Sequence, residues 1–150
     1  MKPYLSLLCL FLLTSCMSDF DAPDSLDQSE TDIIKYIADN NLNAQRSNSG
    51  LYYIIEEEGT GDSPATDSNV TVAYKGYLLD GTVFDQSSSS GISFNLSQVI
   101  PGWTEGLTYF KEGGKGRLII PSHLAYGPNG TSGIPGGAVL VFDISLLKVL

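Results

Sequence analysis

The sequence predicts an α+β fold, in which a curled antiparallel β-sheet wraps over one short α-helix, with an N-terminal helix and a tether ahead of it. Two observations predict this fold. From residue 51 onward, glycine, β-branched and aromatic residues dominate, and the apolar positions alternate as they do in half-buried strands. One short segment, residues 103–110, has helical spacing instead. A sheet with an apolar face needs a covering layer, and we expect this helix to supply it.

The strands are expected between clear turn signals. Four of them are predicted at residues 51–57, 70–79, 116–120 and 138–149. The first ends at a glycine-containing turn, residues 59–61. The second is closed by Asp80-Gly81, which is a strong hairpin signal, and the chain returns from Val83. In the last strand, alternate residues such as Phe142 and Ile144 share one face.

Two helices are predicted. Residues 103–110 place their large apolar side chains on one buried side. Residues 31–38 form a short amphipathic helix, for which Ser29 is the expected N-cap. Residues 47–50 link this helix to the sheet. The N-terminal helix either packs on the domain, acts as a spacer or makes a weak dimer contact; we favour the first two and expect a monomer.

The first residues of the chain have the pattern of a signal peptide. Met1-Lys2 gives a positive start, and residues 5–13 form an almost unbroken apolar run. This run is shorter than the roughly 20 residues that a membrane-spanning helix needs, and it has the length of the apolar part of a signal peptide. We therefore assign residues 1–15 to a signal peptide that is removed.

Residues 13–16, with the sequence Leu-Thr-Ser-Cys, resemble the lipobox of bacterial lipoproteins. In that class the cysteine is diacylated and becomes the new N-terminus. The resemblance implies a lipid-anchored membrane protein of the bacterial cell envelope, held at Cys16. Two acyl chains would hold the protein firmly to a bilayer, and we expect this to be the outer membrane, with the domain facing the periplasm or the cell surface. The alternative is an ordinary secretory signal with an incidental cysteine.

Charge separates the remaining segments. Residues 16–29 contain four aspartates and no basic residue, which is typical of an acidic tether. Residues 30–49 then hold the short helix and its linker, and residues 50–150 the folded domain. The whole chain carries a net charge of −9. Such a charge argues against nucleic acid and against an anionic membrane surface as partners.

The residue types that support many other chemistries are scarce. Of the two cysteines, Cys9 lies in the removed segment and Cys16 is used by lipid, so no disulfide, thiolate metal site or cysteine nucleophile is expected. The single histidine, His123, rules out a histidine metal cluster, and we assign it no role. Residues 111–116 are glycine-rich but lack the spacing of a phosphate loop. We predict neither a metal nor a cofactor.

A series of short blocks covers about the last hundred residues. The blocks are residues 72–77, 80–85, 99–103, 118–121, 125–127, 134–135 and 140–143. In sequence, order and spacing they resemble the FKBP family of prolyl isomerases. The match is more specific than any single motif because seven blocks agree together. The lipobox and the helix at residues 31–38 lie outside it.

The resemblance implies a pocket for a proline ring, with Trp103 as its floor and Asp85 and Tyr126 as polar groups at its rim. Catalytic roles are implied for Tyr74, Phe84, Asp85, Trp103, Tyr126 and Phe142, and substrate-binding roles for Phe94, Val99, Ile100 and Ile134. The backbone N–H of Ile100 is expected to bind a substrate carbonyl. Asp85 has two interpretations that stay open: a structural partner for Tyr74, or an electrostatic contact with the substrate amide.

Two departures from the family concern the walls of this pocket. Ile92 stands where an aromatic residue is common, and the loop of residues 127–137 is slightly shorter than in familiar members. Both bear on substrate preference more than on activity. The resemblance implies an enzyme that speeds rotation about X-Pro bonds in proline-containing segments of exported or envelope proteins. The alternative is a non-catalytic binding module or chaperone of the same fold; a purely structural envelope protein would not explain the aromatic pocket.

Overall fold

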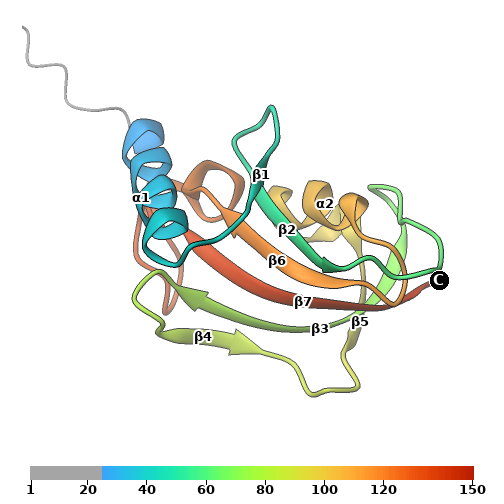
Figure 1. Ribbon diagram of the computed structural model, residues 1–150. Coiled ribbons are helices and arrows are strands. Elements are labelled where there is room, and N and C mark those ends of the chain that lie inside the picture. The colour runs from blue at the N-terminus through green and yellow to red at the C-terminus, as the bar shows by residue number, and fades with distance from the viewer. Residues whose placement is uncertain (1–24) are drawn as a thin grey trace, which may run out of the picture.

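The computed structural model describes residues 25–150; the predicted signal peptide, the predicted lipidation site Cys16 and the part of the predicted tether up to residue 24 lie outside this range. The fold is an antiparallel sheet with one short helix against it and an N-terminal helix, as predicted, and the sheet has seven strands. The strands are β1 (Gln45–Arg46), β2 (Tyr52–Glu57), β3 (Asn69–Leu78), β4 (Val83–Gln86), β5 (Ile92–Asn95), β6 (Lys115–Ile120) and β7 (Leu140–Val149). Their order is β1-β2-β6-β7-β3-β4, and β5 pairs with the first half of β3 (Figure 1).

The helix under the sheet differs in detail from its prediction. Helix α2 spans Pro101–Gly106, and the chain then tightens into a 3-10 turn at Leu107–Tyr109. Pro101 at the first helical position explains the earlier start, because proline has no N–H to satisfy there. Trp103 and Leu107 are both buried, as the helical spacing predicted.

The N-terminal helix α1 spans Ser25–Asp39, so it begins before the predicted N-cap. The N-cap prediction for Ser29 is wrong. Ser29 lies inside the helix, is 1% exposed, and shares a hydrogen bond with Ser122 (Oγ–Oγ 3.2 Å). A buried tertiary partner has outweighed the local preference of serine for helix ends. Residues 25–29, expected in the tether, are therefore helical.

Alternate residues of the sheet serve two separate cores. Leu118, Ile120 and Phe142 pack with Trp103 of α2, whereas Ile119 and Val141 belong to the cluster beneath α1. The second cluster includes the fully buried Ile33 of α1. Helix α1 thus packs on the domain, on the face of the sheet opposite α2. The figure shows α1 at one end of the sheet, well apart from α2 (Figure 1).

Two strands were not predicted. β1 has only two residues, and β5 has four and follows a run of serines, residues 87–90. Neither is long enough to show a period in sequence, so their pairing with β2 and β3 defines them. In the part of the chain that the structure describes, no helix has the length and apolar character needed to cross a membrane.

Candidate active site

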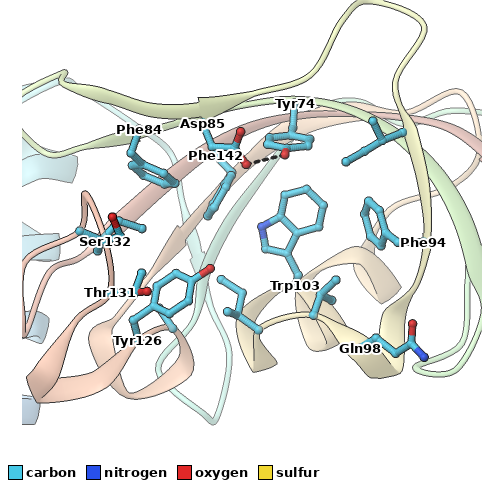
Figure 2. A pocket seen from close by; sticks show the side chains of 15 residues that line it. Tyr74, Phe84, Asp85, Phe94, Gln98, Trp103, Tyr126, Thr131, Ser132 and Phe142 are labelled. Carbon is cyan, nitrogen blue, oxygen red and sulfur yellow. Dashed lines mark hydrogen bonds between the residues drawn. The ribbon is translucent and has the colours of Figure 1, made fainter.

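A pocket of about 770 Å³ opens between α2 and the curved sheet. All ten residues that were assigned from the sequence to catalysis or substrate binding line it. Figure 2 labels most of them, including Trp103 and Tyr126. They come from five elements and two loops. Four strands contribute Tyr74 (β3), Phe84 and Asp85 (β4), Phe94 (β5) and Phe142 (β7), and helix α2 contributes Trp103. The loops contribute Val99, Ile100, Tyr126 and Ile134.

Trp103 is the floor of the pocket, and its indole is held by three other rings. It meets Tyr74 edge-on (centroids 5.0 Å apart, 89°) and Phe142 in the same manner (5.1 Å, 84°), and Phe94 lies tilted at 5.3 Å. Such aromatic pairs contribute about 0.5–1.5 kcal/mol each beyond the burial of their area. Only 4% of Trp103 is exposed, so the floor is held in place by its neighbours and largely shielded from solvent.

The indole N–H of Trp103 is buried, and no oxygen or nitrogen within residues 25–150 accepts from it. Figure 2 places the indole nitrogen on the side of the ring that faces Phe142. The Phe142 ring lies near-perpendicular to the indole, with the ring centroids 5.1 Å apart.

Gly76 allows two of the wall rings to pack closely. A Cβ atom at Gly76 would lie 2.7 Å from ring atoms of both Phe142 and Phe84, which is closer than any real contact. Without it, the two rings meet edge to face at 5.5 Å directly over the backbone of β3. Sequence reasoning gave Gly76 no role, although it lies within the block at residues 72–77.

Tyr74 and Asp85 are joined by a short hydrogen bond, in which the Tyr74 hydroxyl donates to Asp85 Oδ2 at 2.6 Å (Figure 2). Burial raises the pKa of Tyr74 well above its usual value, and the bond to Asp85 raises it further. Tyr74 is therefore a neutral donor at physiological pH. Asp85 is exposed at the rim.

The loop between β6 and β7 supplies the opposite side of the pocket. Tyr126 is 43% exposed, and Figure 2 shows its hydroxyl directed toward the pocket. Mutual hydrogen bonds between Thr131 and Ile134 (N–O 3.0 Å in each direction) close the loop on itself. Ile134 is 7% exposed and packs in the main core, so this loop is anchored rather than free.

Ile100 stands at the start of α2 with an extended backbone. Its carbonyl accepts from the N–H groups of Trp103 (2.9 Å) and Thr104 (3.2 Å). Its own N–H meets no acceptor among the described residues. The binding of a substrate carbonyl by this N–H, which the resemblance implies, stays a prediction.

Five further residues line the pocket without a predicted role there. They are Ile92, Gln98, Ala125, Thr131 and Ser132. Apart from Ile92, at the start of β5, they lie in loops or short turns, where no periodic pattern could identify them. Ile92 had been noted as a departure from the family, and it is 47% exposed at the rim. His123 does not line the pocket.

Comparison with known proteins agrees with this geometry. A family model described as FKBP-type peptidyl-prolyl cis-trans isomerase matches residues 61–147. The chain is 51% identical over 105 residues to the FKBP-type peptidyl-prolyl cis-trans isomerase FkpA of Escherichia coli K12, covering 69% of this chain and 39% of the relative. It is 43% identical over 141 residues to FkpA of Aeromonas hydrophila, covering 91% and 51%. The chain therefore spans between about two fifths and half of these relatives.

Solved structures show the same fold. The crystal structure of FkpA from Escherichia coli superposes with a TM-score of 0.74 at 43% identity, over 83% of this chain and 60% of that one. A peptidyl-prolyl cis-trans isomerase from Pseudomonas syringae pv. tomato gives 0.74 at 36% identity, over 86% and 97%. With the matched region covering more than half of the sequence and including the whole pocket from Tyr74 to Phe142, the chain belongs to the FKBP-type peptidyl-prolyl cis-trans isomerase family.

Proposed function

We propose that this chain is a peptidyl-prolyl cis-trans isomerase, which accelerates rotation about X-Pro bonds in polypeptides. The observation that carries the proposal is the assembly of the ten assigned residues around one pocket with a buried tryptophan floor. Such a pocket suits a proline ring, which is compact, apolar and without a charge. Its polar groups lie at the rim, where the flanking peptide would pass.

The reaction needs little more than this environment. Rotation about a peptide C–N bond costs about 18–20 kcal/mol because resonance gives the bond double-bond character, and X-Pro bonds exchange in tens to hundreds of seconds. At the twisted transition state the amide has lost resonance and much of its dipole. A dry, apolar pocket favours that state over the planar amide, which water stabilises, and so lowers the barrier.

The side chains divide this work. The proline ring packs on Trp103, which fixes one side of the rotating bond. The Ile100 N–H and the Tyr126 hydroxyl donate to carbonyls on the flanking peptide and hold the other side in a productive geometry. No bond to the protein forms and no proton is transferred.

A refolding assay tests the proposal. The full chain is added to a protein whose slow refolding phase is limited by an X-Pro bond, and the rate of that phase is measured against enzyme concentration. We expect acceleration by the wild type and a severalfold or greater loss in Trp103→Leu. An unaltered slow phase at micromolar enzyme would contradict catalysis and leave a proline-binding module or chaperone of the same fold.

We also propose that the protein is a monomer, anchored by lipid at Cys16 in the outer membrane, and that its substrates are exported or envelope proteins. The support for the lipid anchor is the Leu-Thr-Ser-Cys sequence of residues 13–16, which ends the apolar run of the predicted signal segment. Expression in bacteria fed labelled fatty acid tests the anchor. Label is expected in the wild type and in the control Cys9→Ala; label that persists in Cys16→Ala would contradict it, and membrane fractionation then tests the location.

A further inference from the structure

The segment that precedes the family match makes contacts on both sides of the pocket. The match begins at residue 61, whereas α1, β1 and the whole of β2 lie before it. In Figure 1 the hairpin that joins β1 to β2 rises between α2 and the chain that follows β6. That chain begins with the 3-10 turn η3 (Ser122–Leu124), which leads directly into the rim residue Tyr126.

Ser49, at the tip of this hairpin, contacts both elements. Its hydroxyl donates to Glu105 Oε2 on α2 at 2.6 Å, and its carbonyl oxygen lies 2.9 Å from Nε2 of His123 on η3. Glu105 is two residues beyond Trp103, the floor, and His123 is three residues before Tyr126, the rim. One residue therefore links the elements that carry the two sides of the pocket.

The tip of the hairpin is itself well fixed. Gly50, the next residue, has φ = +91°, a conformation that favours glycine, and its N–H donates to the carbonyl of Ser47 at 3.2 Å. Leu51 is fully buried in the core shared with Trp103. Ser49 is thus presented from a rigid turn.

Further hydrogen bonds tie the hairpin and η3 to α1. Glu30 of α1 accepts from Arg46 Nε at 2.9 Å and from the Tyr52 hydroxyl at 2.6 Å, at either side of the hairpin. The buried Ser29–Ser122 hydrogen bond joins α1 to η3. Helix, hairpin and turn form a closed set of contacts around Ser49.

We propose that Ser49 is a positioning residue for the isomerase site, which sets the separation between the floor at Trp103 and the rim at Tyr126. This role rests on the proposed function, since it concerns the fit of the pocket to the rotating peptide. Ser49 is too far along the hairpin to line the pocket itself. A small displacement of catalytic groups by a remote substitution can reduce activity substantially.

The test compares Ser49→Ala, which removes the hydroxyl, with Ser49→Thr, which keeps it. Ser90→Ala is the matched control, because Ser90 also makes an exposed hydroxyl contact in a turn, with Ser88 at 2.8 Å, but touches neither α2 nor η3. His123→Ala removes the second link. Two readouts are made on the full chain: kcat/KM for a prolyl peptide, and the emission of Trp103, the only tryptophan in the chain.

We expect Ser49→Ala and His123→Ala each to lower kcat/KM by about threefold to tenfold and to shift the Trp103 emission, while Ser49→Thr and Ser90→Ala behave as the wild type. The change should fall mainly on kcat, because the displaced rim no longer fits the twisted amide. Wild-type values of both readouts in Ser49→Ala would overturn the assignment, as would an equal loss in Ser90→Ala. A wild type without activity would refute the proposed function instead, and the emission of the variants would then decide the role of Ser49.

Discussion

On the pocket face of β3, Tyr74 donates its hydroxyl to Asp85, whereas on the opposite face Tyr77 donates to Asp143. The two pairs have the same chemistry and lie three residues apart on one strand. In both, burial is the main cause that raises the tyrosine pKa, and a neighbouring aspartate adds to it. The pairs therefore differ in their surroundings rather than in their composition.

The two pairs differ in whether the aspartate also forms an ion pair with a basic side chain. Asp143 also accepts from Arg117 Nε at 2.7 Å, and the Arg117 side chain is only 21% exposed. No basic side chain within residues 25–150 forms an ion pair with Asp85, which faces the pocket entrance. Negative charge is thus neutralised on the α1 face and left available on the pocket face. This favours a direct electrostatic contact between Asp85 and substrate in addition to its bond with Tyr74.

The largest effect on kcat/KM is expected at β7, where two adjacent residues point to opposite faces of the sheet. Phe142→Leu replaces a flat wall ring and should lower kcat/KM by about tenfold or more, because about 1.4 kcal/mol of transition-state stabilisation corresponds to a factor of ten. Val141→Ala, on the α1 face, should lower the free energy of unfolding by about 2 kcal/mol and leave kcat/KM unchanged. Steady-state kinetics and denaturant unfolding measure the two. Equal kinetic loss in both would mean that stability, not the wall, sets activity.

The next effect concerns the two aspartates. Asp85→Asn keeps an acceptor for Tyr74 but removes the charge, and we expect kcat/KM to fall by about threefold to tenfold, with little loss of stability at this exposed site. Asp143→Asn removes the counter-charge of the partly buried Arg117, so it should reduce stability by about 1–3 kcal/mol and spare catalysis. If Asp85→Asn has wild-type kinetics while Asp85→Ala does not, the role of Asp85 is only to fix Tyr74.

The sequence predicted those parts of the molecule that have a local signal. The alternation of β7 correctly separated Phe142 from Val141, and the Asp80-Gly81 turn correctly located the β3–β4 hairpin. Nine of the ten site residues lie in blocks whose spacing resembles a family, Phe94 was assigned from the same resemblance, and the structure gathers all ten in one pocket. Local preference and tertiary packing agree at these positions.

The features that were missed depend on contacts between distant residues. Ser29 looked like a helix cap, but its bond to Ser122 spans 93 positions, and no nearby residue indicates it. β5 is defined by its register with β3. Ser49 lay in what looked like a plain linker, and its two partners are 56 and 74 positions away. Such pairings follow from the folded arrangement and leave no period in the sequence.

A smaller effect is expected on the pH dependence of stability. It tests whether Tyr74 and Tyr77 both have a raised pKa despite their different neighbours. The pKa of each is higher in the folded protein than its ordinary value of 10.0. A raised folded pKa gives stability that is fully present below pH 10 and is lost as pH rises above it. Tyr74→Phe and Tyr77→Phe should therefore each make the free energy of unfolding fall less steeply above pH 10. Val141→Ala, which removes no titrating group, should keep the wild-type slope, and a wild-type slope in both tyrosine variants would contradict the shift.

The smallest effect is expected at the rim. Tyr126→Phe keeps the ring and removes one solvent-exposed hydroxyl, whose hydrogen bond to a substrate carbonyl competes with water, so we expect kcat/KM to fall only about twofold. Tyr109→Phe is a matched control, because Tyr109 is similarly exposed but binds Glu105 outside the pocket. A loss in Tyr126→Phe as large as that in Asp85→Asn would shift the main polar contact with substrate from the β4 side of the pocket to the loop after β6. The unpaired charge of Asp85 would then no longer explain the difference between the two faces of the sheet.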